Sequence, residues 1–335
     1  LNELISAGAD AFLIGEKQFG LRLPGEFNLN EIEKSVQLAH ASNKKVYVSM
    51  NALFHNEKID ALLPYMKNLE KMNVDGIVFG DPAIVQIKKD SQLSIPLHWN
   101  TETTATNWFT ANYWGRRGAN RAVLARELSL EEVVEIKENA EVAIEVQIHG
   151  MTCMFQSKRA LLGNYFLYQD KAMEIENRSS GKPMFLHDKE RNNKYPIFED
   201  VNGTHIFSPN DMCLIDELGE MIEAEIDSFK INGILQEESY ITTVTALYRQ
   251  AIDAYAESPD LYEEVKDQLS EQETLYPAST YFQYSNLGLT LLGEIVAEIS
   301  GMSYPEYITK NILEPLGLSS TRPVMPADKY GQELA

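Results

Sequence analysis

The sequence is short of cysteine, of basic residues and of long apolar runs. Two cysteines among 335 residues exclude a disulfide framework and are typical of a protein in a reducing cytoplasm. Lysine and arginine number 29 against 50 acidic residues, and the net charge of −21 disfavours a general binder of DNA or RNA. No apolar run approaches the ~20 residues that cross a bilayer, so we expect no membrane contact. Composition therefore indicates a cytoplasmic globular protein.

Short apolar runs alternate with helical patterns over residues 1–260, which we predict to be one domain. The runs with strand character are Ala11–Gly15, Lys45–Asn51, Gly76–Phe79, Leu97–Glu102, Arg121–Glu127, Ala143–His149 and Ser228–Asn232. This alternation predicts parallel βα units and an α/β fold. Seven strands are one fewer than a TIM barrel contains, and an open doubly wound sheet is the alternative.

Polar residues gather at or just past the ends of these runs, where α/β folds place their binding sites. The predicted substrate-binding residues are Asn51, Asp81, Asn100, Glu102, Arg126, Glu127 and Lys230. Arg126 and Lys230 would suit an anionic substrate, because arginine binds carboxylates through paired hydrogen bonds and lysine as a point charge. Each residue alone could instead cap a loop. Their convergence predicts a small-molecule pocket.

The stretch Ala143–Phe166 carries the predicted catalytic residues. Strand alternation places Glu145 and His149 on one face, and Gly150 ends the strand shortly before Cys153. A carboxylate and an imidazole on one face could share a proton, with one of them as general base. The alternative is that both fill a barrel core as hydrogen-bonded polar groups. No Cys–His–Asn or Ser–His–Asp signature accompanies Glu145, His149 and Cys153, so the residues alone show no peptidase mechanism.

The order and spacing of Glu145, Gly150 and Cys153 resemble the signature of the collagenase-like peptidases, peptidase family U-thirty-two. Gln147 stands where that family has an aromatic residue, and Ser157-Lys158-Arg159 replaces a Ser-Gly-Cys continuation. The likeness covers about residues 1–273 and is to the family's short-subunit branch. It implies a TIM-like barrel whose first strand would precede this chain, so we expect a barrel that lacks that strand.

The resemblance also implies a function. Members of the family are implicated in prephenate-dependent hydroxylation of a tRNA wobble uridine, in which the short branch works with a longer paralogue. We therefore expect a subunit of a tRNA-modifying enzyme, with prephenate as co-substrate, tRNA as a partner and the longer paralogue in a hetero-oligomer. A peptidase, as the family name states, and a non-catalytic partner subunit are the alternatives.

Cys153 and Cys213 match two of the four iron–sulfur ligands found in some relatives of this family. Cys153 follows the central strand, and Cys213 ends the string Ser208-Pro209-Asn210-Asp211-Met212-Cys213. The other two ligand positions hold no cysteine, and a cluster ordinarily needs four thiolates. We expect no metal site and no iron–sulfur cluster. The two cysteines would then be residual ligands or inert buried side chains.

Residues 261–275 form a predicted acidic linker, and residues 276–335 differ in character from the barrel. Tyr284-Ser285-Asn286 and Glu314-Pro315-Leu316-Gly317-Leu318 resemble elements of a beta-lactamase-related serine hydrolase, over about residues 277–323. That family's nucleophile belongs to a Ser-x-x-Lys motif that opens a helix. The strings Ser42…Lys45 and Ser179…Lys182 match by letter alone, because neither opens a predicted helix. We expect a small, mainly helical and inactive fragment.

Overall fold

The computed structural model describes residues 1–23, 25–100, 105–169, 184–190, 193–258, 262, 302 and 304–315. The chain divides into two units, Leu1–Pro277 and Ala278–Ala335. Three sequence features named above, Glu102, the Ser179…Lys182 string and Tyr284-Ser285-Asn286, lie outside the described residues.

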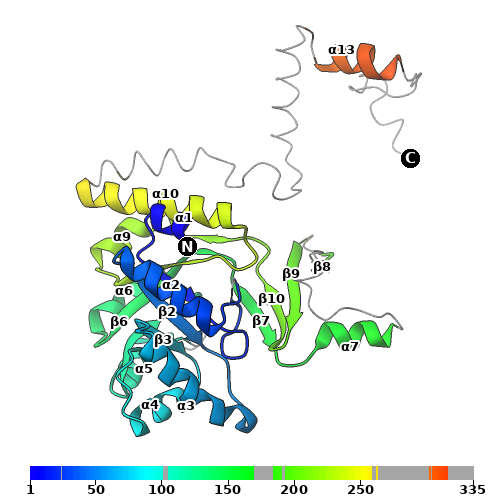
Figure 1. The fold of residues 1–335 in the computed structure, drawn as a ribbon. Helices are drawn as coiled ribbons and strands as arrows, with labels where there is room; N and C mark the ends of the chain where they lie inside the picture. The colour runs from blue at the N-terminus through cyan, green and yellow to red at the C-terminus, as the bar shows by residue number, and fades with distance from the viewer. Residues whose placement is uncertain are drawn as a thin grey trace. The chain divides into compact units, whose positions relative to one another are not determined.

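A curled sheet of parallel strands forms the centre of the first unit (Figure 1). Its strands are β1 (Ala11–Ile14), β2 (Lys45–Met50), β3 (Gly76–Phe79), β4 (Leu97–Trp99), β5 (Ala119–Val123), β6 (Ala143–Gly150) and β12 (Ser228–Asn232). They pair in the order β1-β2-β3-β4-β5-β6, and β12 pairs in parallel with β6. The predicted α/β class is confirmed. β4 and β5 end earlier than predicted, so Asn100, Arg126 and Glu127 follow their strands instead of lying within them.

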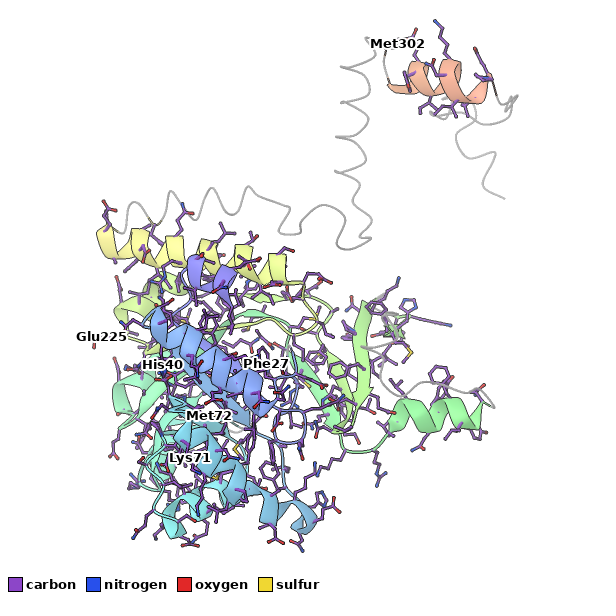
Figure 2. All side chains as sticks on the ribbon, viewed as in Figure 1. Phe27, His40, Lys71, Met72, Glu225 and Met302 are labelled. Atoms are coloured by element: carbon purple, nitrogen blue, oxygen red, sulfur yellow. The ribbon has the colours of Figure 1, made fainter. Side chains whose placement is uncertain are left out.

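One helix precedes the first strand, and the others follow strands and cover the outer face of the sheet. They are α1 (Asn2–Ser6), α2 (Leu29–Ala41), α3 (Asn56–Lys71), α4 (Pro82–Asp90), α5 (Trp108–Gly115), α6 (Leu130–Asn139), α9 (Leu218–Glu223) and α10 (Glu238–Glu257). Asn28 starts α2 through a capping box with Glu31, as the spacing of an N-cap and a glutamate three residues later predicts. Val48 of β2 and Leu62 of α3 are fully buried in the same core, and Phe27 packs against it (Figure 2).

The inner face of the sheet is polar. Strand alternation sends Val46, Val48 and Met50 into the helix-covered core, so Tyr47 and Ser49 point to the other side. His98, Asn100, Glu145 and Gln147 are among the buried polar residues of the neighbouring strands and their ends. Buried polar groups need hydrogen-bond partners or a ligand, so this face is where a site can form.

The two ends of the parallel sheet meet without pairing. Among the described strands, β1 pairs only with β2, and β12 pairs only with β6. Helix α10 lies beside α1 at this seam (Figure 1). Arg249 of α10 donates from Nε to the carbonyl oxygen of Gly8 at 3.2 Å and forms an ion pair with Asp10, just before β1. Arg249 therefore connects α10, the helix after β12, to the residues just before β1.

An insertion between β6 and β12 builds a second, antiparallel sheet beside the first (Figure 1). Its elements are β7 (Cys153–Ser157), α7 (Leu161–Tyr168), β8 (Met184–Asp188), β9 (Asn193–Asp200) and β10 (Gly203–Phe207), in the strand order β7-β10-β9-β8. The short β11 (Met212–Cys213) then returns to pair antiparallel with β6. We call residues 151–207 the insertion. Its polar sequence predicts a loop over 177–202, but the described residues there form β8 and β9, because pairing across the sheet outweighs local propensity.

The described part of the second unit is helical. α13 (Tyr304–Ile308) continues into a π-helical turn, Thr309–Leu313, whose last residue is buried. Among the described helices of the whole chain, none combines the length and the apolar character that crossing a bilayer requires.

Candidate anion-binding site

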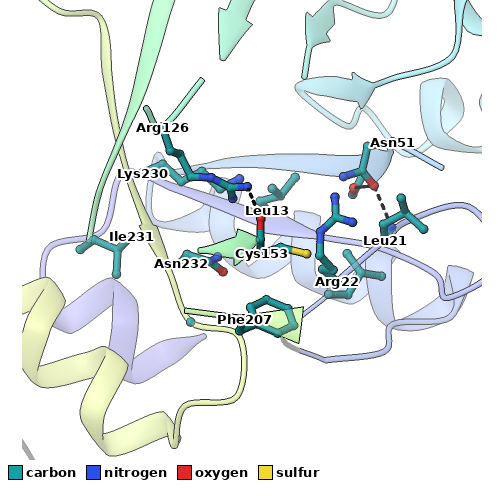
Figure 3. Close-up of a pocket in the computed structure, with 13 residues that line it drawn as sticks. Leu13, Leu21, Arg22, Asn51, Arg126, Cys153, Phe207, Lys230, Ile231 and Asn232 are labelled. Atoms are coloured by element: carbon teal, nitrogen blue, oxygen red, sulfur yellow. Dashed lines mark hydrogen bonds between the residues drawn. The ribbon is translucent and has the colours of Figure 1, made fainter. Parts of the chain in front are cut away.

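A pocket of about 60 Å³ lies where the carboxyl ends of the parallel strands meet the insertion (Figure 3). Its described lining consists of Leu13, Leu21, Arg22, Leu23, Ser49, Asn51, Arg126, Cys153, Phe207, Lys230, Ile231, Asn232 and Gly233. The lining thus combines β1, β2 and β12 with the loop after β5 and with β7 and β10 of the insertion. This end of a parallel sheet is the usual location of ligand sites in α/β folds.

Three cations face this pocket. Arg126 and Lys230 approach from one side and Arg22 from the other, with Cys153 between them (Figure 3). The described lining residues include no aspartate or glutamate. Arg126 donates from Nη2 to the Cys153 carbonyl at 3.2 Å, and Arg22 donates from Nη1 to the Gln156 side chain at 2.7 Å. The charged side chains among its described lining residues are all cations, and clustered positive charge in a concave site attracts anions.

Arg22 comes from a loop that two parts of the fold hold in place. The Asn51 side chain accepts a hydrogen bond from the Leu21 amide at 2.7 Å, and Asn202 of the insertion donates to the Lys17 carbonyl at 2.9 Å. Arg22 has a φ of 53°, a conformation that costs a non-glycine residue free energy and persists where its surroundings impose it. Arg22 is not among the residues predicted for this site. Its only local signal is a cation in a glycine- and proline-containing loop just past a strand.

The structure brings four of the predicted residues together and leaves others elsewhere. Asn51, Arg126, Cys153 and Lys230 line the pocket. Asp81 instead caps α4, because its carboxylate accepts hydrogen bonds from the Ala83 amide at 2.9 Å and the Phe54 amide at 2.8 Å. Asn100 is buried and Glu127 is exposed, both outside the described lining, and Glu102 is not described.

Glu145 lies in a buried polar layer outside the pocket lining. Its carboxylate accepts hydrogen bonds from Arg121 Nη1 at 3.0 Å and from Ser228 Oγ at 3.1 Å. Arg121 lies over the ring of Tyr47, which packs edge-on against His98. Burial, together with the charge of Arg121, lowers the pKa of His98 to about 3. The Glu145 carboxylate therefore links three strands: its ion pair with Arg121 joins β6 to β5, and its hydrogen bond with Ser228 joins β6 to β12.

His149 has different partners from Glu145. Lys230 pairs with Gln147 and Ile231 with His149, so Ile148 forms a bulge and the alternation along β6 breaks there. His149 shares hydrogen bonds with the Tyr240 hydroxyl at 2.8 Å and the Tyr248 hydroxyl at 3.4 Å, both from α10. Burial lowers the pKa of His149, and nearby Asp211 opposes that shift. The bulge therefore directs His149 to α10 while Glu145 stays with β5 and β12.

The two cysteines lie in different settings. Cys153 lines the pocket, and its thiol donates to the Phe155 carbonyl at 3.4 Å. Cys213 of β11 is exposed and contacts the Tyr248 hydroxyl at 3.5 Å. Within the described residues, no group of three or more His, Cys, Asp or Glu side chains could hold a metal ion.

Comparison with known proteins identifies the family. The model of Peptidase family U32 matches residues 1–288. The chain belongs to this family. Tyr284-Ser285-Asn286 falls inside the matched range.

Relatives within the family carry names that concern tRNA. The tRNA hydroxylation protein P2 of Bacillus subtilis (strain 168) is 57% identical over 277 residues, covering 82% of this chain and 90% of the relative. The tRNA hydroxylation protein P1 of the same organism is 34% identical, covering 79% of this chain and 63% of the relative. The tRNA hydroxylation protein P of Escherichia coli (strain K12) is 27% identical, covering 73% and 64%. The chain thus spans less than two thirds of the last two proteins.

Proposed function

We propose that this chain is a subunit of a tRNA-modifying enzyme that hydroxylates a wobble uridine, and that its pocket binds the co-substrate prephenate. The names of the P2, P1 and E. coli relatives support the tRNA reaction. The single structural observation behind the co-substrate is the pocket with Arg22, Arg126 and Lys230 and no carboxylate in its described lining. Prephenate is a dicarboxylate, and two arginines and a lysine supply a cationic hydrogen-bond donor for each of its two carboxylates, with one cation in excess.

The longer paralogue is the proposed partner. P1 and P2 occur in one organism, which allows such a pair. This chain covers 90% of P2 but only 63% of P1, which supports its place as the shorter subunit. The unpaired edges of β1 and β12 among the described strands support a TIM-like barrel that lacks one strand between them. We infer that the residues from about 277 onward are an inactive serine hydrolase-like fragment.

Deletion of the gene tests the proposed reaction. Total tRNA is digested to nucleosides and analysed by mass spectrometry, and we expect the hydroxylated uridine to disappear and to return with the wild-type gene. Arg126→Ala and Arg22→Ala should each reduce it tenfold or more, because a hydrogen bond to a charged group contributes about 1.5–3 kcal/mol. Lys71→Ala removes an exposed cation at the end of α3 and serves as the matched control.

Two other results would redirect the assignment. An unchanged nucleoside profile, together with casein or gelatin cleavage that Cys153→Ser or Glu145→Gln abolishes, would assign a peptidase. Loss of the modification with full activity of the Arg126→Ala and Arg22→Ala variants would leave the chain as a non-catalytic partner subunit. Calorimetric titration of the purified chain with prephenate tests the binding proposal separately from the proposed reaction, because binding needs neither tRNA nor the paralogue.

A further inference from the structure

Exposed apolar side chains concentrate on the insertion. The described part of the chain has 14 large hydrophobic residues that are exposed, and nine of them belong to residues 151–207. They are Met154, Phe155, Leu161, Tyr165, Leu167, Tyr168, Phe185, Leu186 and Val201. Single exposed apolar residues are ordinary, but a contiguous group marks an interaction surface.

The strand register places a row of apolar side chains straight across the second sheet. Phe155 pairs with Ile206, Ile206 with Ile197, and Ile197 with Met184, so the row takes one residue from each of the four strands. Directly paired residues lie on the same face. Leu186 is two residues beyond Met184 and shares that face. We call this row together with Leu186 the apolar row.

Helix α7 extends the same surface. The Glu199 carboxylate accepts hydrogen bonds from the amides of Leu162 at 2.9 Å and Gly163 at 3.1 Å, which fixes the first turn of the helix. Gly163 is the only residue of α7 that is buried. A helix that is apolar on nearly all sides gains little from water on those sides, so α7 needs a further partner to cover Tyr165 and Leu167.

The charge of the insertion indicates what kind of partner fits. Its described residues contain four cations, Lys158, Arg159, Lys189 and Lys194, and four anions, Asp188, Glu190, Glu199 and Asp200. Over its full sequence the insertion has eight cations and seven anions, so it carries a net charge of only +1 on a chain that carries −21. A nearly neutral, apolar surface suits protein, whereas nucleic acid needs a larger excess of cations. A second copy of this acidic chain would meet the least repulsion here.

The edge of the second sheet is complementary to itself. Among the described strands, β8 pairs only with β9 and leaves its other edge open. If two copies of β8 pair antiparallel about Leu186, Phe185 faces His187 and Met184 faces Asp188, with no like charges opposed. Such a twofold arrangement is the commonest form of protein dimer, and strand addition at an open edge is a common mode of association. We propose that the apolar row and β8 form the interface of a homodimer of this chain.

This interface lies outside the lining of the proposed prephenate pocket and does not depend on the proposed reaction. Sedimentation equilibrium of the full chain, over a range of concentrations, should show a monomer–dimer equilibrium. The dimer should tighten when salt rises from 50 to 500 mM, because salt screens the repulsion between two −21 chains. Leu186→Lys should weaken dimerisation at least tenfold, since a lysine on an edge strand opposes pairing.

The matched control is Leu53→Lys, which changes another exposed leucine, outside the insertion, and should leave the dimer intact. Circular dichroism checks that each variant folds. If Leu186→Lys does not fold, Phe155→Lys takes its place in the experiment. A monomer at every concentration and salt, or equal effects of both leucine variants, would overturn the proposal. So would tight binding of the longer paralogue, or of a tRNA stem-loop, that replaces self-association and is lost in Leu186→Lys.

Discussion

Single polar residues near the ends of the strands divide into those that line the pocket and those that hold the fold. Arg126 and Lys230 face the pocket, whereas Asp81, at the equivalent end of β3, has its carboxylate committed to two backbone amides. Glu145 similarly holds Arg121 and Ser228. Position at a strand end therefore predicts where a side chain lies, but its local hydrogen-bond partners decide whether it is available to a ligand.

His98 should make the stability of the fold depend on pH. In the folded chain its pKa falls to about 3, chiefly through burial, whereas the unfolded chain takes up the proton near pH 6.5. Between these values the unfolded state binds more protons, so the free energy of unfolding falls as the pH falls, by up to about 1.4 kcal/mol per pH unit. Urea unfolding at pH 7, 5.5 and 4.5 should show a shallower loss for His98→Phe than for the wild type.

The exposed His55 supplies the control for this measurement. The His55 side chain is exposed and caps no helix, so the free energy of unfolding of His55→Phe should change with pH as steeply as that of the wild type. Parallel profiles for the wild type and His98→Phe would show that His98 takes up its proton equally in both states and would contradict the expectation.

At the scale of elements, the seam between β1 and β12 is the least supported part of the sheet. Every other parallel strand has partners on both sides, whereas these two have an open edge among the described residues. Arg249 compensates in part, since it joins α10 to Gly8 and Asp10. Helix contacts can hold two strands near each other, but they do not supply the ladder of backbone hydrogen bonds that protects amides.

Hydrogen exchange measures that difference. We expect the amides of β1 and β12 to exchange faster than those of β3 and β4, and Arg249→Ala to speed exchange in β1 further. Arg117→Ala is the control, because Arg117 lies over the Tyr113 ring on the surface of α5. Equal protection of all the parallel strands would mean that the sheet closes through residues other than those described.

At the scale of the whole molecule, the net charge of the chain differs from the charge of its local surfaces. The chain carries −21 overall, yet its pocket gathers three cations and its insertion carries a net charge of only +1. Net charge keeps copies of a protein apart and dissolved, while local groups decide what binds.

The fragment from about residue 277 onward should not react with beta-lactams. Covalent labelling of beta-lactamase-related serine hydrolases needs the serine of a Ser-x-x-Lys motif at the start of a helix. Ser42 instead ends α2, and Lys45 begins β2. Incubation with a fluorescent penicillin should leave the chain unlabelled on a denaturing gel, beside a labelled penicillin-binding protein. A labelled band that Ser42→Ala or Ser179→Ala removes would show a working nucleophile and refute this view.

The sequence alone determined the α/β class, the places of the parallel strands and the family, because apolar periodicity and the spacing of Glu145, Gly150 and Cys153 are local properties of the chain. It also predicted that Arg126 and Lys230 lie together, since parallel strands carry their carboxyl ends to one edge, and both residues line the pocket.

Only the tertiary structure decided which polar residues meet. Arg22 joins the pocket through contacts with Asn51 and the insertion that lie far apart in the sequence, and no local pattern records them. The bulge at Ile148 turns His149 to α10, although simple alternation predicts one face with Glu145. Such long-range contacts depend on how whole elements pack, and packing is settled by the sum of many weak interactions rather than by any single segment.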